Sequence, residues 1–219
     1  MENNLLENKL LENKLLMKRS DAAEIDVIEG VLLKELSVDD KVCRDLLSKG
    51  IVIISGELTP WSTPHLLRLI LGASLYANEL RVLIHSEGGV LTIGWALYDL
   101  LEAIAAHKRV ITIGLGRVQS AATLPFLAGT ERLATRGCIF TLHEAHTVTV
   151  GKVSEHEDTL KMLRKYETLY DELVASKTKL SKRTIRERRS RREWHFTAEE
   201  ALKYGFAHRF AEPADLLPF

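Results

Sequence analysis

The sequence predicts an α/β protein built mainly on parallel strands, because short apolar runs alternate with segments of helical periodicity. Three β-branched runs, at residues 51–54, 80–84 and 110–113, end at glycine or polar turn residues as buried strands do. Apolar residues recur at helical spacing over 63–77 and 91–106, between these runs. Strands joined by helices pair in parallel, so the alternation predicts a parallel sheet covered by helices.

The composition is that of an ordinary globular protein. The chain has 219 residues, of which 46% are hydrophobic and 27% charged, which is enough apolar material for a full core. Thirty basic residues balance thirty acidic ones, so no overall field favours nucleic acid or a membrane surface as a partner. No apolar run reaches the roughly 18 residues that a membrane-spanning helix needs.

The two cysteines indicate the cellular compartment. Cys43 and Cys138 are too few for a disulfide framework and both lie in apolar stretches, so we expect buried thiols in a reducing environment. The N-terminus lacks a charged-then-apolar signal pattern, which favours the cytoplasm. We expect no cofactor and no metal.

The first residues differ in kind from the rest of the chain. Residues 1–16 contain a pentapeptide repeat, ENNLL, ENKLL, ENKLL, whose period advances about 140° per repeat on a helix and so forms no single stripe. We interpret 1–16 as a leader added before a domain that begins near Met17; an oligomerising helix is the alternative. Residues 17–43 are expected to form an N-terminal arm, 44–212 the main domain and 213–219 a tail.

Further elements are expected at both ends of the main domain. A short helix over 42–47 ends at Gly50, and the longest helical pattern covers 154–178 with one charged face. The basic run at 182–192 is interpreted as a solvated or interface helix, because it lacks the interleaved aromatic residues of a nucleic-acid site.

The C-terminal part of the domain has one further helix signal. Thr197 and Glu200 form a capping box for a helix that ends at Gly205, and residues 206–210 are then a last short strand.

The stretch from residue 110 to His143 holds the candidate catalytic residues. Its first strand, 110–113, is expected to stop at Gly114 and Gly116, and Ser120 then begins a helix. A second strand over 138–142 ends on His143. A serine at a strand-to-helix turn with a histidine nearby is the arrangement of a nucleophile and its base. A helix-capping serine and a structural histidine would give the same spacing.

A glycine pair precedes this stretch. Gly88 and Gly89 follow the strand over 80–84 and allow the positive φ that brings a backbone close to a ligand. A tight turn without a ligand is the alternative interpretation.

Five segments in order resemble one family. RDLLSKGIVIISGEL, SEGGVLTIGWALYDLLE, TIGLGRVQSAATLPFLAG, FTLHEA and FTAEEALKYGFAHRF, which together cover residues 44–210, are similar to ClpP, the proteolytic subunit of the Clp protease. The resemblance implies the ClpP/crotonase-like fold of repeated β-β-α units with a long protruding handle helix, here at 154–178.

The resemblance assigns roles to single residues. Ser120 falls on the family's nucleophile and His143 on its general base, while the amides of Gly89 and Ala121 fall on the oxyanion hole. In that mechanism a neutral imidazole takes the serine proton and the alkoxide attacks a peptide carbonyl. Each oxyanion donor is typically worth about 3–4 kcal/mol.

The sequence departs from the family pattern around this site. The family's SPGG is SEGG here, with a charge at Glu87, and bulkier residues 117–119 precede Ser120. Residues 146–150 replace the glycine-rich strand that holds substrate peptide in the family.

The third triad position departs further. The family's aspartate falls on Arg189, with Ser190 beside it, and a cation there would disfavour an imidazolium. Glu187 or Glu193 would supply an acid only with a shift in register.

The resemblance implies a serine endopeptidase that cleaves polypeptides inside a ring chamber. Seven subunits form a ring and two rings stack through the handle helix as a tetradecamer, with an AAA+ ATPase unfoldase or a ClpP paralogue as further partners. The alternative is an inactive ClpP-like ring subunit that lacks the triad acid. A third interpretation is a crotonase-type acyl-CoA enzyme, which shares the fold; the sequence shows no adenine or pantetheine signature.

Overall fold

A computed structural model describes residues 38–217. The leader predicted over 1–16 lies outside the described residues, as does most of the arm predicted over 17–43. The chain divides into two units, 1–45 and 46–219, and the second unit holds the sheet, its covering helices and all of the candidate site residues.

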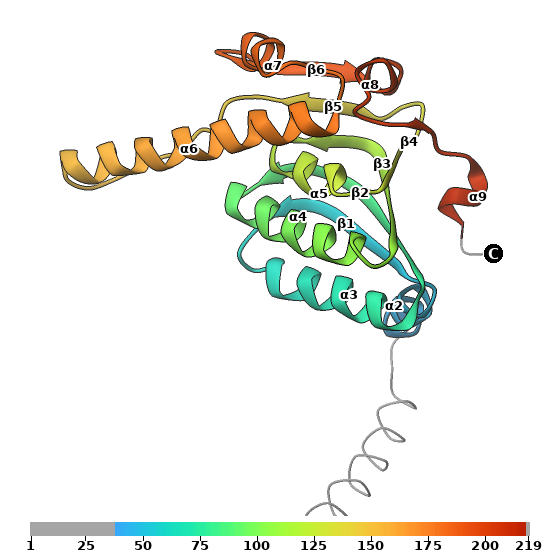
Figure 1. The fold of residues 1–219 in the computed structure, drawn as a ribbon. Helices are drawn as coiled ribbons and strands as arrows, with labels where there is room; N and C mark the ends of the chain where they lie inside the picture. Colours follow the sequence, from blue (N-terminus) through green and yellow to red (C-terminus); the bar gives the residue numbers. More distant parts are fainter. Residues whose placement is uncertain (1–37, 218–219) are drawn as a thin grey trace, which may run out of the picture. The chain divides into compact units, whose positions relative to one another are not determined.

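One mixed sheet of seven strands forms the body of the second unit (Figure 1). Five strands run in parallel in the order β1-β2-β3-β4-β7, β5 pairs in parallel with β3, and β6 is antiparallel to β5. The strands are β1 Ile51–Leu58, β2 Glu79–Gly89, β3 Arg109–Gln119, β4 Glu131–Ala134, β5 Ile139–Leu142, β6 Trp194–Thr197 and β7 Arg209–Phe210. The predicted α/β class with mainly parallel strands is confirmed.

The helices follow the predicted alternation. They are α2 Val38–Ser48, α3 Thr63–Tyr76, α4 Leu91–Ala105, the short 3₁₀ turn η1 Ser120–Ala122, α5 Thr123–Leu127, α6 Val153–Lys177, α7 Lys182–Arg189, α8 Ala198–Tyr204 and α9 Pro213–Leu216. The capping box predicted at Thr197 and Glu200 is present, and Gly205 ends α8 in the left-handed conformation.

The expectation that Gly114 and Gly116 end the third strand is wrong. β3 continues to Gln119 because it changes partner: Ile111–Gly114 pair with β4, and Arg117–Gln119 pair with β5. Gly116 lies between the two pairings with a φ of 61°, which a residue without a Cβ adopts freely. The glycine therefore redirects the strand and carries it to Ser120.

The first two strands are also longer than predicted. β1 continues past residue 54 to Leu58, and β2 continues past residue 84 to Gly89, with a register shift in each pairing. The glycine pair is consequently the end of a strand, paired with the end of β1, and the tight-turn alternative is wrong.

Two strands carry no clear signal in the sequence. β4 and β6 have four residues each and contain charged or polar side chains, so their pairing depends on neighbours distant in the chain. The strand predicted over 206–210 shortens to β7, and Phe206 before it is buried in the core.

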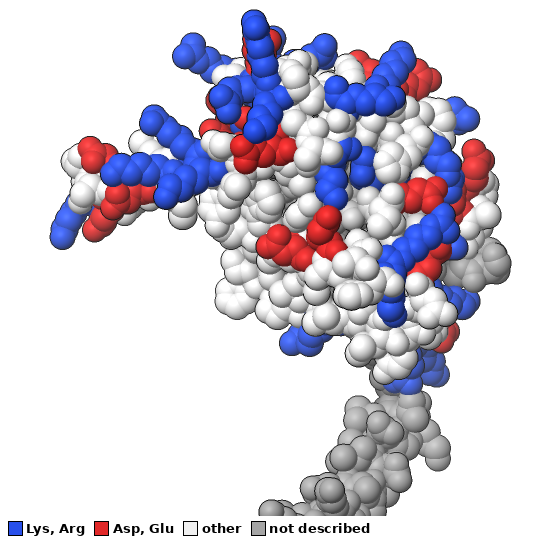
Figure 2. Space-filling view, viewed as in Figure 1, with Lys and Arg blue, Asp and Glu red and all other residues white. Residues whose placement is uncertain are grey.

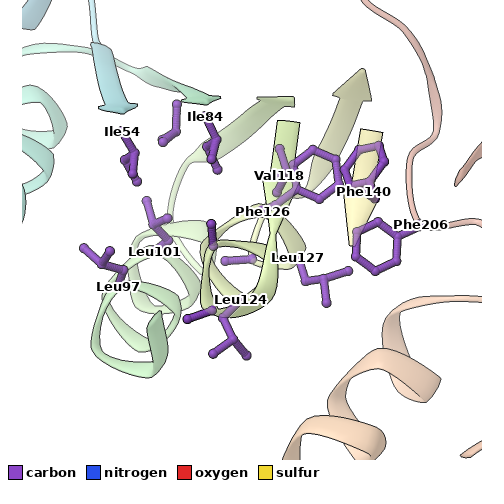
Figure 3. Packing of buried hydrophobic residues seen from close by; sticks show 14 of the residues in the cluster. Ile54, Ile84, Leu97, Leu101, Val118, Leu124, Phe126, Leu127, Phe140 and Phe206 are labelled. Atoms are coloured by element: carbon purple, nitrogen blue, oxygen red, sulfur yellow. The ribbon is translucent and has the colours of Figure 1, made fainter. Parts of the chain in front are cut away.

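Aromatic packing fixes β5 against the helix that follows η1. The ring of Phe126 on α5 lies 5.0 Å from that of Phe140 on β5 and 5.6 Å from that of Phe206. Figure 3 shows these rings beside Leu124, Leu127 and Val118. Because Ser120 precedes α5 and His143 follows β5, this cluster sets the relative positions of the two segments that carry them.

The charged helices α6 and α7 contact each other through Asp171, Arg186 and Arg189. α6 extends away from the body (Figure 1), and Figure 2 shows basic and acidic side chains together along α6 and around α7. Within α6 the buried residues are confined to its C-terminal half, Tyr170, Asp171, Leu173 and Val174. No helix of the described chain combines the length and apolarity needed to cross a membrane.

Two burial expectations need correction. The basic run is predicted to be a solvated or interface helix and most of it is exposed, but Arg189 at the end of α7 is only 3% exposed because carboxylates surround it. Of the two cysteines, Cys138 is buried as expected, while Cys43 is only half-buried on α2.

Two glycines provide a test of the packing. A Cβ on Gly94 would lie 2.5 Å from the Ala121 carbonyl oxygen, so Gly94→Ala must displace α4 or η1 and should lower the free energy of unfolding by about 1–3 kcal/mol. Gly72 on α3 has no atom within 4 Å of such a Cβ, so Gly72→Ala should leave the free energy of unfolding unchanged or raise it by up to about 1 kcal/mol. Urea denaturation at one protein concentration compares them; equal effects would contradict the close packing.

Candidate active site

Ser120 stands at a strained turn between β3 and η1. Its φ is 51°, a left-handed value that costs a residue with a Cβ about 1–2 kcal/mol. The hydroxyl of Thr123 donates to the Ser120 carbonyl oxygen at 2.6 Å and lies 2.7 Å from the Tyr170 hydroxyl on α6. The turn is thus held from both the sheet and α6. Strained conformations of this kind cluster at functional sites.

The glycine end of β2 lies directly against this turn. Gly88 and Gly89 have φ values of 97° and 138°, and a Cβ on Gly88 would lie 2.7 Å from the Ser120 Cβ and 3.0 Å from the Ala121 nitrogen. The Gly88 N–H donates to the Ser86 hydroxyl at 3.0 Å. Because the Gly88 amide has this partner, Gly89 is the better candidate for an oxyanion donor.

The four residues to which the sequence assigned the chemistry line one pocket of about 610 Å³. Gly89, Ser120, Ala121 and His143 come from the end of β2, the η1 turn and the end of β5. The pocket wall also includes Tyr166, Glu167 and Tyr170 from α6, as well as Arg189. Residues from β2, η1, α6, α7 and the segment after β5 therefore meet around the serine.

His143 is half-buried and oriented by a main-chain group. Its Nδ1 lies 2.6 Å from the carbonyl oxygen of Glu144, and a carbonyl can only accept. Nδ1 therefore carries the proton in this contact, which leaves Nε2 as the basic nitrogen. Within the described residues the Ser120 hydroxyl makes no hydrogen bond, and such catalytic contacts often tighten only when substrate binds.

Arg189 occupies the place predicted for the third triad member and is paired on two sides. Its Nε and Nη2 each lie 2.9 Å from Asp171 Oδ1, and its Nη1 lies 3.2 Å from Glu167 Oε1. Burial acts to lower the pKa of Arg189, but the hydrogen bond and charge of Asp171 outweigh it and hold that pKa above its ordinary value. The cation that the sequence places at this position is therefore compensated by two carboxylates.

The acids proposed as substitutes for the missing aspartate lie elsewhere. Glu187 pairs with Arg183, and Glu193 pairs with His195, at exposed positions. Neither contacts His143 in the described part of the chain.

Ser190, the neighbour of Arg189, bonds to the residue after the histidine. Its hydroxyl donates to Glu144 Oε1 at 2.9 Å, and the Arg191 N–H donates to Glu144 Oε2 at 3.2 Å. The backbone bond from Arg191 and the hydroxyl of Ser190 lower the pKa of Glu144 below its ordinary value. Glu144 therefore remains a carboxylate at neutral pH.

The other departures from the family pattern also have structural consequences. Glu87 beside the glycine pair forms an ion pair with Arg117 at 3.3 Å, so its charge is partly compensated. Residues 146–150 form no strand, and Val148 and Val150 are more than 90% exposed. Residues 146–150 therefore provide no strand edge to which an extended peptide could pair.

Comparison with known proteins identifies the family. The family model described as Clp protease matches residues 34–213. The chain belongs to the Clp protease family. It is similar to the ATP-dependent Clp protease proteolytic subunit 2 of Treponema denticola, with 28% identity over 82% of this chain and 90% of that protein. It is also similar to subunit 1 of Leifsonia xyli, with 25% identity over 84% of this chain and 94% of that one.

A solved structure supports the fold of this Clp protease family member. A ClpP1 mutant from Listeria monocytogenes matches with a TM-score of 0.71 and 21% identity, over 80% of this chain and 99% of that chain. At this identity the likeness establishes the fold, which is the expected ClpP/crotonase-like one.

Sequence reasoning did not single out Glu144, Glu167, Tyr170 or Asp171. A signal for part of this set is present in the spacing. Glu167 and Asp171 are four residues apart on one helix, and Arg186 and Arg189 are three apart on the next, so each pair lies on one helical face. Pairs of opposite charge on consecutive helices predict that the two helices contact each other. They do not predict that this contact borders the active site.

The buried ion pair gives a stability prediction. Arg189→Ala leaves the 1%-exposed side chain of Asp171 with Arg186 as its one remaining ion-pair partner among residues 38–217, and should lower the free energy of unfolding by about 3–5 kcal/mol. Arg183→Ala, on the same helix, removes an exposed pair and should leave the unfolding midpoint close to that of the wild type. Thermal unfolding compares the two; equal midpoints would show that the Arg189 pair contributes no more than a surface one.

Proposed function

We propose that this Clp protease family member is a serine endopeptidase that cleaves unfolded polypeptides or peptides, with Ser120 as nucleophile and His143 as general base. The observation that carries the proposal is the left-handed turn at Ser120, packed against Gly88 and opening into the pocket that His143 lines. A serine that merely caps a helix has no need of a strained φ.

The chemistry follows from the hydrogen bond to His143. With Nδ1 donating to the Glu144 carbonyl, Nε2 accepts the proton of the Ser120 hydroxyl as its oxygen attacks the substrate carbonyl carbon. The same proton passes to the leaving amine when the tetrahedral intermediate collapses to an acyl-enzyme. Water then attacks the acyl-enzyme with His143 again as base.

The amides of Gly89 and Ala121 are the proposed oxyanion donors. Both line the pocket on either side of Ser120, where negative charge develops on the carbonyl oxygen. Part of the remaining pocket wall comes from α6, which contributes Met162, Leu163 and Tyr166 as an apolar surface for a substrate side chain.

The orienting group is the main difference from a complete triad. A backbone carbonyl fixes the imidazole tautomer, but it is a dipole and stabilises an imidazolium less than a carboxylate does. Loss of a triad acid typically costs about 10⁴ in kcat, so we expect slow turnover.

A second candidate function is that of an inactive ring subunit, favoured by Arg189 at the position of the family's acid. In this alternative the chain supports the chamber and an active paralogue performs the cleavage.

The proposed assembly is a homo-oligomer of seven-subunit rings, stacked as a tetradecamer through α6. The names of the curated relatives, which are called proteolytic subunits of an ATP-dependent protease, support an AAA+ ATPase unfoldase as a partner. The exposed Leu160, Met162 and Leu169 on the protruding helix support a protein contact there. The two free cysteines support a cytoplasmic location.

Labelling with a fluorophosphonate probe tests the proposed nucleophile. The wild-type protein should label over hours, Ser120→Ala should not label, and His143→Ala should label at least about 100-fold more slowly because the base is gone. Fluorescence of the labelled band and mass spectrometry of the modified peptide give the rate and the site.

Two matched variants complete that experiment. Ser74→Ala and His107→Ala remove a serine and a histidine outside the pocket and should label as the wild type does. Absence of labelling in a wild-type protein that mass photometry finds assembled would refute the peptidase and favour the inactive subunit.

A further inference from the structure

The segment His143 to Ala145 is held residue by residue from two helices. Arg189 Nη1 approaches the His143 carbonyl oxygen at 3.5 Å, a long hydrogen bond, and Ser190 and Arg191 donate to the Glu144 carboxylate. The Ala145 N–H donates to Glu167 Oε1 at 3.1 Å. Three consecutive residues that include the proposed base are therefore tied to the end of α7 and to α6.

Glu167 and Arg189 connect these ties. The same Glu167 oxygen that accepts from Ala145 accepts from Arg189 Nη1 at 3.2 Å, and Arg189 is in turn fixed by the buried Asp171. A guanidinium held in this way has little freedom to rotate, because burial and two carboxylates define its plane. The chain from Asp171 through Arg189 and Glu167 ends on the main chain at Ala145.

The position of the segment decides that of the imidazole. His143 makes its hydrogen bond through Nδ1 to the carbonyl of the next residue, so the ring direction depends on the peptide between His143 and Ala145. Beyond Ala145, residues 146–150 are exposed and form no regular structure, and the His146 ring, 5.5 Å from that of His143, is a further contact of the imidazole.

We propose that Arg189 and Glu167 are positioning residues, which hold the His143–Ala145 main chain and through it aim Nε2 at Ser120. This inference rests on the proposed function. The role that a carboxylate performs by contact with the imidazole is taken here by a charged pair that acts on the backbone. A merely structural pair would support the fold equally well without affecting the direction of the imidazole.

Glu167 offers the sharper test, because it is 28% exposed and its loss spares the Arg189–Asp171 pair. Glu167→Ala removes the acceptor for Ala145 and should lower kcat for a peptide substrate at least tenfold with KM within about twofold, since misplacement of a catalytic group by about 1 Å can cost about 100-fold. Glu167→Gln keeps an amide oxygen for the Ala145 N–H and should restore most of kcat. Glu172→Ala on the same helix, which loses only an exposed pair with Lys182, should match the wild type.

A second measurement separates this proposal from the proposed function. The ¹³C-methyl NMR signal of Ala145, assigned by Ala145→Ser, should shift and broaden in Glu167→Ala and remain in place in Glu167→Gln and Glu172→Ala. This signal reports the position of the His143–Ala145 main chain whether or not the protein cleaves peptides. An inactive wild type would therefore refute the peptidase, and the methyl signal would still test whether Glu167 holds this segment. An unchanged methyl signal in Glu167→Ala, or a changed signal without a fall in the kcat of an active enzyme, would overturn the positioning role.

Discussion

The close approach of three backbone segments at Ser120 is the constraint on which the site depends. Gly88 at the end of β2 and Gly94 on α4 both lie where a Cβ would come within 3 Å of the Ser120–Ala121 turn. Because neither glycine has a Cβ, β2 and α4 can approach the turn closely. The turn itself contains Ser120 in a left-handed conformation, which is rare for a residue with a Cβ. The turn leads directly into α5, which packs against β5 through the rings of Phe126 and Phe140.

The change of partner along β3 is what brings the serine and the histidine together. Its first half pairs with β4 and its second half with β5, so that β3 ends at Ser120 beside the strand that ends at His143. Both residues leave the same edge of the sheet because parallel strands have their carboxyl ends on one side. Catalytic residues at such an edge are positioned by the sheet itself, and only their fine orientation is left to other elements.

The orientation of His143 comes from α6 and α7, where the family's triad acid is replaced by the basic residue Arg189. A triad acid would contact the imidazole, whereas the buried Arg189 is compensated by Asp171 and Glu167 and acts on the main chain next to the histidine. Tyr170 extends the same helix face to the other half of the site, since its hydroxyl meets Thr123, which bonds the Ser120 carbonyl. One face of α6 thus touches the supports of both proposed catalytic residues. The positive charge of Arg189 is compensated by two carboxylates, which explains how an arginine is tolerated beside the proposed base.

The sequence by itself determined the α/β class, the bounds of α3, α4 and α6 to within two residues, the family and the identity of four pocket residues. These features depend on local periodicity, turn chemistry or ordered motifs, which a chain carries without reference to distant partners. The true length of β1, β2 and β3, the existence of β4 and β6, and the burial of Arg189 were decided only by the tertiary structure. A strand that continues through glycines needs a partner for its backbone groups, and an arginine is buried only where carboxylates from another helix meet it. Both depend on residues far away in the chain, and so no local pattern reveals them.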